Sequence, residues 1–161
     1  MMNPIPLYMT HDLSRLPDYR LPDGYHFRIF SYDSDVKHWT KIVTETGEFA
    51  SETQALQRFD REFKPYLNEV KKRIIFIETH DGQIAGTAAA WFGEWNQTTI
   101  GRLHWVEIKP AYQRKKLGKP LVAKAMQLLH HYHQTAFLKT NPGDQPRRPL
   151  YLSPIQIQTR H

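Results

Sequence analysis

The sequence predicts an α/β (α+β) protein with a mixed, mostly antiparallel central sheet flanked by helices. Short runs of β-forming residues alternate with longer stretches in which apolar residues recur every three or four positions. The pair Asp81-Gly82 separates two of the apolar runs, which is a strong signal for an antiparallel hairpin. The expected elements follow the order β–α–α–β–β–β–α–β, which is typical of helices packed against one sheet.

The first part of the chain predicts an arm, a strand and two helices. Residues 1–24 contain several prolines and few periodic apolar positions, so we expect an extended N-terminal arm there. The alternating aromatic run over residues 25–30 predicts the first strand. Asp33 or Ser34 could cap a first helix. Ser51, with a glutamine three residues later, has the form of a capping box and predicts a second helix, with a proline as a blemish near its end.

Five further elements are expected before a tail. Strands are predicted over residues 73–78, 84–92, 99–108 and 135–139, and a helix over residues 117–132. The last residues, 142–161, are rich in proline and are interpreted as an irregular tail. The folded domain is therefore expected over residues 25–141.

Composition limits the class of protein. A chain of 161 residues can build one core but not two ordinary domains. It has no apolar run near the roughly 18 residues that a membrane span needs, and its N-terminus lacks the pattern of a secretion signal. Cysteine is absent, which excludes disulfides and thiolate chemistry. We therefore expect a cytoplasmic protein without a membrane partner.

A cluster of basic residues lies at the expected start of the last helix. A helix start presents backbone N–H groups without intrahelical partners and carries partial positive charge. The basic side chains there are Arg114, Lys115, Lys116 and Lys119. This combination favours a site for phosphate or pyrophosphate. A solvated helix start that happens to carry lysines is an equally weighted alternative.

Two adjoining segments resemble a known family. The segment Gln113-Arg114-Lys115-Lys116-Leu117-Gly118-Lys119 resembles the pyrophosphate loop of Gcn5-related N-acetyltransferases (GNAT), Gln/Arg-x-x-Gly-x-Gly/Ala. It follows Val106-Glu107-Ile108-Lys109-Pro110, which is similar to the strand that precedes this loop in the family. The resemblance implies a GNAT-like acyl-CoA N-acyltransferase fold. It also implies an enzyme that moves an acetyl group from acetyl-CoA to a primary amine without a metal.

The resemblance assigns roles in cofactor binding. The segment formed by Val106, Glu107 and Ile108 would pair with the pantetheine arm, and the N–H of Val106 would polarise the acetyl carbonyl. The loop residues assigned to the pyrophosphate are Gln113, Arg114, Lys115, Lys116, Leu117, Gly118 and Lys119. Asn141 matches a position that often contacts the cofactor. Lys116 stands where the family has a glycine, so it would strain the loop if its φ is positive.

His104 is the candidate general base. A primary amine must lose a proton before attack, because a lysine-type amine has a pKa of about 10.4. Alternate residues over 102–108 are expected to share one face of their strand, which would place His104 beside the reacting groups. Arg102 occupies the position of the glutamate base in the histone-modifying branch of the family. Glu107, expected on the opposite face, and Glu94, expected in a loop, are alternatives.

Tyr151 is the candidate general acid. Leu150-Tyr151 resembles the start of the family motif whose tyrosine reprotonates the CoA thiolate, although the Gly-Phe pair that should follow is absent. The last two strands of the family are also missing from the sequence. One hypothesis is that the C-terminus is altered or truncated. Another is that a second subunit completes the sheet, which would make the protein a homodimer.

Other classes of function remain as alternatives. The helices between residues 33 and 70 would line the acceptor side, but they do not identify the small molecule or protein that carries the amine. A catalytically weak CoA-binding or regulatory module is the first alternative. A nucleic-acid-binding domain is a remote one: the net charge is +6, but no basic recognition element is present. His130 and His133 share a helix face without a partner carboxylate, which favours a packed or solvated helix end over a metal site.

Overall fold

The computed structural model of this protein describes residues 7–140 and 153–154. The strands are β1 Leu7–His11, β2 Tyr25–Ile29, β3 Ile74–Thr79, β4 Ile84–Trp95, β5 Thr98–Ile108, β6 Ala136–Thr140 and β7 Ser153–Pro154. The helices are α1 Ser34–Glu45, α2 Glu52–Glu62, α3 Leu67–Arg73 and α4 Gly118–Tyr132, with 3-10 turns η1 Lys64–Tyr66 and η2 Pro110–Tyr112.

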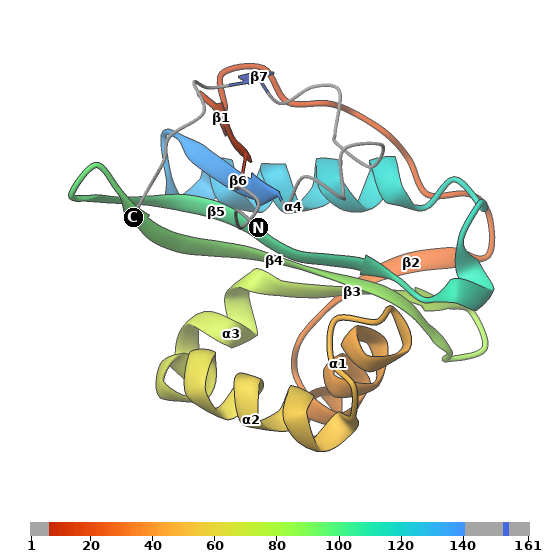
Figure 1. The fold of residues 1–161 in the computed structure, drawn as a ribbon. Helices are drawn as coiled ribbons and strands as arrows, with labels where there is room; N and C mark the ends of the chain where they lie inside the picture. The colour runs from red at the N-terminus through yellow and green to blue at the C-terminus, as the bar shows by residue number, and fades with distance from the viewer. Residues whose placement is uncertain (1–6, 141–152, 155–161) are drawn as a thin grey trace, which may run out of the picture.

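Within the described residues, seven strands form one sheet in the order β2-β3-β4-β5-β6-β1-β7. Helices α1, α2 and α3 lie on one face of this sheet and α4 lies on the other (Figure 1). All strand pairings are antiparallel except that between β5 and β6. The predicted fold class, a mostly antiparallel sheet flanked by helices, is therefore confirmed.

Local signals account for several element boundaries. The Ser51 hydroxyl caps α2 by accepting a hydrogen bond from the backbone N–H of Gln54 at 3.2 Å, as the capping-box pattern predicted. Gly82 has a φ of 87° in the turn between β3 and β4, where the Asp-Gly pair predicted a hairpin. The single helix expected after Ser51 is divided, because Pro65 lies in the 3-10 turn that separates α2 from α3.

The N-terminal arm contributes a strand that its sequence did not indicate. Residues 1–24 were expected to be an extended arm, but Leu7–His11 forms β1 and pairs antiparallel with β6. Met9 and Leu13 are each only 1% exposed, so the arm is packed into the core. The edge of β6 that faces away from β5 is therefore occupied by the N-terminal part of the same chain.

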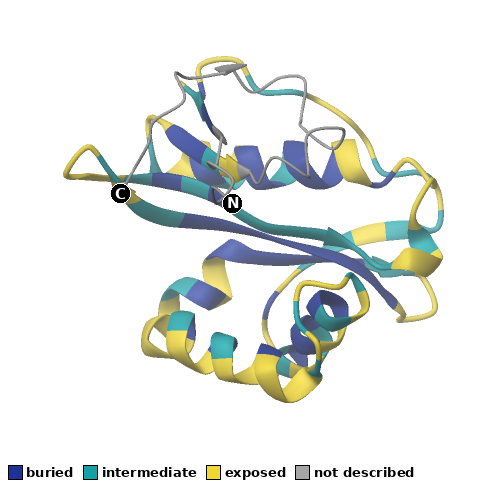
Figure 2. Cartoon of the chain, viewed as in Figure 1, coloured by how far each residue is buried: buried dark blue, intermediate teal, exposed yellow. Residues whose placement is uncertain are grey.

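The two faces of the sheet pack against different cores. Small and aliphatic residues of β4 and α4 fill one side, whereas an aromatic cluster that includes Trp39, Phe59 and Phe63 fills the side of α1 to α3. Residues 84–91 of β4 are all buried, and Figure 2 shows this strand between the helical layers. A strand covered on both faces cannot alternate polar with apolar residues, which explains its continuous apolar run.

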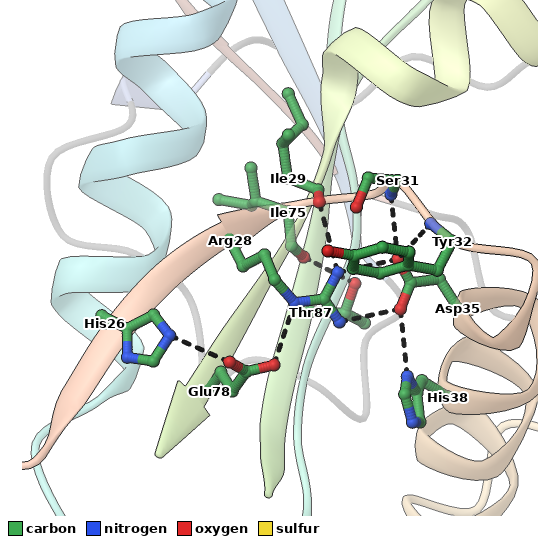
Figure 3. A network of polar contacts seen from close by, with 10 residues as sticks. All are labelled: His26, Arg28, Ile29, Ser31, Tyr32, Asp35, His38, Ile75, Glu78 and Thr87. Carbon is green, nitrogen blue, oxygen red and sulfur yellow. Dashed lines mark hydrogen bonds and ion pairs between the residues drawn. The ribbon is translucent and has the colours of Figure 1, made fainter. Parts of the chain in front are cut away.

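A buried ionic network holds α1 against the sheet (Figure 3). Arg28 of β2 donates two hydrogen bonds of 2.8 Å to the carboxylate of Asp35 and one of 2.9 Å to Glu78 of β3. Asp35 also accepts from the backbone N–H groups of Ser31 and Tyr32. Burial alone would raise the pKa of Asp35, but these hydrogen bonds outweigh it and hold that pKa well below 3.8. The network sets the position of α1, on which α2 packs.

Candidate active site

The site lies where β5 separates from β6. The parallel pairing of these strands is limited to Gly101 with Ala136 and Arg102 with Phe137. Beyond Arg102, no described strand pairs with the side of β5 that faces away from β4. Unpaired backbone groups at such an edge can accept an extended ligand as if it were another strand.

A bulge at Trp105 changes which residues face each side. Trp105 has a φ of 51°, and the pairing of β5 with β4 shifts register there. Leu103, Val106 and Ile108 pack in the core beneath α4, whereas Trp105 packs against the aromatic core on the other face. The expectation that alternate residues over 102–108 share one face is therefore wrong, because the extra residue reverses the alternation.

The backbone of β5 after the bulge is directed as the resemblance requires. The N–H of Lys109 donates to the Ala85 carbonyl of β4 at 2.9 Å. Since directions alternate along a strand, the N–H groups of Val106 and Ile108 point to the open edge. The Ile108 carbonyl already accepts a hydrogen bond from the Gln113 side-chain amide at 3.1 Å. The side chain of Gln113 thus holds the loop to the end of β5, a role that the sequence did not indicate.

A basic cavity lies beside this open edge. Its volume is about 640 Å³, and its walls come from η2, the following loop and the start of α4. Its lining residues are Tyr19, Arg20, Ile108, Tyr112, Gln113, Arg114, Lys116, Leu117, Gly118, Lys119 and Pro120. None of these is acidic, and α4 begins without a side-chain cap on its N–H groups. The cavity therefore combines cationic side chains with free backbone donors, as an anion site requires.

Most of the predicted loop residues meet at this cavity. Of the predicted pyrophosphate residues, only Lys115 is outside the lining. Lys116 has a φ of 62° and Arg114 one of 63°, so the condition under which Lys116 strains the loop is met. A left-handed conformation costs a residue with a side chain about 1–2 kcal/mol. A Cβ added at Gly118 would meet no protein atom within 4 Å, so the fold itself does not demand glycine there.

Two residues of the cavity come from the N-terminal arm and were missed. Tyr19 and Arg20 line the cavity together with the loop. The Lys119 ammonium lies 5.5 Å from the centre of the Tyr19 ring. Nothing in the spacing of the arm signals this role, because it arises from a contact between segments about a hundred residues apart.

On the other face of β5, His104 meets a carboxylate. His104 Nε2 is hydrogen-bonded to Glu62 Oε1 of α2, and the Trp105 indole N–H donates to the same oxygen at 3.2 Å. Burial lowers the pKa of His104 below 6.5, and the positive charge of Arg102 adds to this although Glu62 opposes it. Burial would raise the pKa of Glu62, but the hydrogen bond from His104 keeps it below 4.5. The pair is thus a neutral imidazole and an ionised carboxylate at neutral pH.

The remaining candidates have different outcomes. Asn141 and Tyr151 lie outside the described residues. Glu107 follows the bulge, so alternation with Val106 and Ile108 places it on the face of His104 instead of the opposite face. Glu94 belongs to β4 and pairs with Thr99, so the expectation of a loop there is wrong.

The histidines at the end of α4 do not gather metal ligands. His133 Nε2 lies 2.9 Å from an Arg73 nitrogen, which supports a packed helix end. Across residues 7–140 and 153–154, no group of three or more potential metal ligands occurs. No helix in the same residues is long and apolar enough to cross a membrane.

Comparisons with solved structures agree with this fold. A GCN5-related N-acetyltransferase from Sphaerobacter thermophilus has a TM-score of 0.72 at 14% identity, over 94% of this chain and 50% of that chain. One from Kribbella flavida has a TM-score of 0.63 at 18% identity, over 92% and 54%. Glucosamine-6-phosphate N-acetyltransferase from Arabidopsis thaliana has a TM-score of 0.55 at 16% identity, over 86% and 99%.

The chain spans about half the length of the first two of these structures. No curated protein matches its sequence. The model of the acetyltransferase (GNAT) family matches residues 36–153, a stretch that contains α2, the open edge of β5 and the loop of the basic cavity. The match covers well over half of the chain, and the chain therefore belongs to the acetyltransferase (GNAT) family.

Proposed function

We propose that this protein is an acetyl-CoA-dependent N-acetyltransferase that acts on a primary amine of a small molecule or a protein. The observation that carries the proposal is the basic cavity at the start of α4, placed at the end of an unpaired strand edge. Family membership supports acetyl transfer from acetyl-CoA in general. Family membership does not identify the amine that accepts the acetyl group.

The residues present fit acetyl-CoA. The pyrophosphate would lie in the cavity against the N–H groups that begin α4, where Arg114, Lys116 and Lys119 supply positive charge. The pantetheine arm would continue along β5, whose Val106 and Ile108 N–H groups point to the open edge. When bound, acetyl-CoA would supply the acetyl group and depart as CoA.

The chain's own groups suit the proton transfer. With Glu62 ionised, the proton on the neutral imidazole of His104 resides on Nε2 and the lone pair resides on Nδ1. A base with a lowered pKa is unprotonated at neutral pH and can take the amine proton directly or through water. The N–H of Val106 would donate to the acetyl oxygen as negative charge develops there. Tyr151 stays the proposed acid and Asn141 a proposed cofactor contact.

One observation favours an alternative function. The side chain of Lys116 stands where the family has a glycine and would crowd the pyrophosphate, and its left-handed conformation adds strain to the loop. A catalytically weak CoA-binding or regulatory module is therefore the second candidate.

Two measurements separate these functions. Calorimetric titration with acetyl-CoA tests cofactor binding, and absence of heat or stabilisation at about millimolar ligand would contradict both candidates. Release of free CoA thiol with a panel of primary amines then tests turnover. Binding with release identifies the enzyme, whereas binding without release for any amine identifies the module. A His104→Asn variant serves as the catalytic control, because it leaves the cavity intact.

A further inference from the structure

Two arginines, Arg58 and Arg102, lie beside the Glu62–His104 pair. Arg58 of α2 forms an ion pair of 3.7 Å with Glu62 and stacks over the rings of Phe49 and Trp105. Arg102 stacks over Phe137 at 5.6 Å, at the last pairing before β5 and β6 separate. The Nε atoms of both arginines are buried and have no hydrogen-bond partner.

Both arginine side chains lie on the face of the sheet that carries His104. Arg102 and His104 are two residues apart, and both precede the bulge. Their side chains therefore lie on the same face of β5, the face of α2. Glu62 lies near both Arg58 and Arg102, His104 is neutral, and Glu107 adds a second carboxylate on this face. The Nε–H groups of both arginines are nevertheless buried donors without an acceptor among the described residues, which is costly, so a ligand anion that accepts hydrogen bonds from these guanidinium groups would be favoured.

We infer that the acceptor is a small primary amine that also carries an anionic group, held by Arg58 and Arg102. The inference rests on the proposed function, because it assigns the acceptor of that same site. The anion would receive hydrogen bonds from guanidinium groups that are already oriented by ring stacking, and the amine would face His104. Neither arginine lines the cavity at the start of α4, so this anion site is separate from the cofactor's.

The inference is tested with matched amines. 4-Aminobutyrate and O-phosphoethanolamine carry a carboxylate and a phosphate, whereas butylamine and ethanolamine carry the same kind of amine without an anion. We expect kcat/KM to be higher for the anionic members by about tenfold or more, the factor that a hydrogen bond between charged groups supplies. The ratio of kcat/KM for the two anionic compounds shows whether the site prefers a carboxylate or a phosphate.

Variants assign the preference to the arginines. Arg58→Gln should reduce the preference for anionic amines to about unity, while Arg58→Lys should retain part of it. Arg61→Gln is the matched control, because Arg61 is an exposed residue of the same helix, and it should leave the preference unchanged. Thermal unfolding of each variant shows whether the fold is intact, and Arg102→Gln is the second variant if Arg58→Gln does not fold.

A binding measurement separates this inference from the proposed function. O-Phosphoethanolamine is titrated into the full chain without acetyl-CoA, at low and high salt. Salt-sensitive binding that Arg58→Gln weakens supports the anion site even if no amine is acetylated. Equal kcat/KM for anionic and neutral amines, a preference that survives Arg58→Gln, or no binding of either anionic amine would overturn it.

Discussion

His104 Nε2 and Glu62 Oε1 are joined by a hydrogen bond that links β5 to the last turn of α2. The contact holds the imidazole in one orientation on the face of α2. The bulge in β5 places Glu107 on the same face. It fixes the proton on Nε2 and leaves the other ring nitrogen as the acceptor. The site thereby contains an imidazole whose pKa is lowered below 6.5, mainly by burial.

The pH dependence of turnover should report this pair. Activity should rise as pH climbs through the lowered pKa of His104 and then level off, because only the neutral imidazole accepts a proton. Glu62→Gln removes an influence that raises this pKa, so the acidic limb should move to lower pH. Arg102→Gln removes an influence that lowers it, so the limb should move to higher pH.

The measurement is kcat/KM for a primary amine without an anionic group, such as butylamine, from about pH 5 to about pH 9. His104→Asn should reduce kcat by about a hundredfold or more and abolish the limb. An unchanged profile in His104→Asn would exclude His104 as the base.

Gly118→Ala should separate stability from cofactor binding. The added methyl group meets no protein atom within 4 Å, and alanine favours a helix over glycine by about 0.5–1 kcal/mol. The free energy of unfolding should therefore stay equal or rise. Binding of acetyl-CoA should weaken, because the methyl would occupy space needed by a phosphate. Unchanged affinity in calorimetry would mean that the phosphate does not approach Gly118.

Lys116→Gly should relieve the left-handed backbone at this position. We expect the free energy of unfolding to rise by about 1 kcal/mol, as measured in urea, once the greater freedom of glycine in the unfolded chain is included. Lys116→Gln is the matched control, because it removes the charge and keeps the strain. Both variants lose the charge, so tighter acetyl-CoA binding by Lys116→Gly than by Lys116→Gln would identify the side chain as an obstruction. Equal affinities would argue against obstruction.

Arg20→Gln should weaken acetyl-CoA binding although it lies outside the family's loop. Arg20 lines the cavity and adds positive charge to it. Loss of one phosphate contact should raise Kd by about threefold to tenfold and reduce its salt dependence. Arg15→Gln is the comparison, because Arg15 is exposed on the same arm and lies outside the lining. Equal effects of the two variants would reduce the role of Arg20 to general surface charge.

Asp35→Asn should destabilise the fold without touching the cavity. The change leaves the Arg28 guanidinium without its buried partner, at a cost of about 3–5 kcal/mol. Because the pKa of Asp35 is lowered, its contribution to stability is complete above the unfolded value of 3.8 and is lost as pH falls below it. Urea unfolding at neutral and acidic pH should therefore show wild type and Asp35→Asn converging in acid. Parallel losses would contradict this role.

Much of the fold follows from short-range chemistry. The Ser51 cap depends on a side chain and an N–H three residues apart, and the turn at Gly82 depends on one residue that tolerates positive φ. The loop before α4 is similarly local, since its bases and its helix start are adjacent in sequence. Such features can be predicted because the interacting groups are neighbours along the chain.

What the sequence by itself determined, then, is the class of fold, most of the order of its elements and the basic loop at the start of α4. Tertiary structure decided the rest: the pairing of β1 with β6, the cavity wall from Tyr19 and Arg20, and the contact of His104 with Glu62. A bulge at Trp105 also decided which side chains of β5 lie on the face of α2. These depend on register and on contacts between distant segments, and a single extra residue in one strand reverses every side chain that follows it.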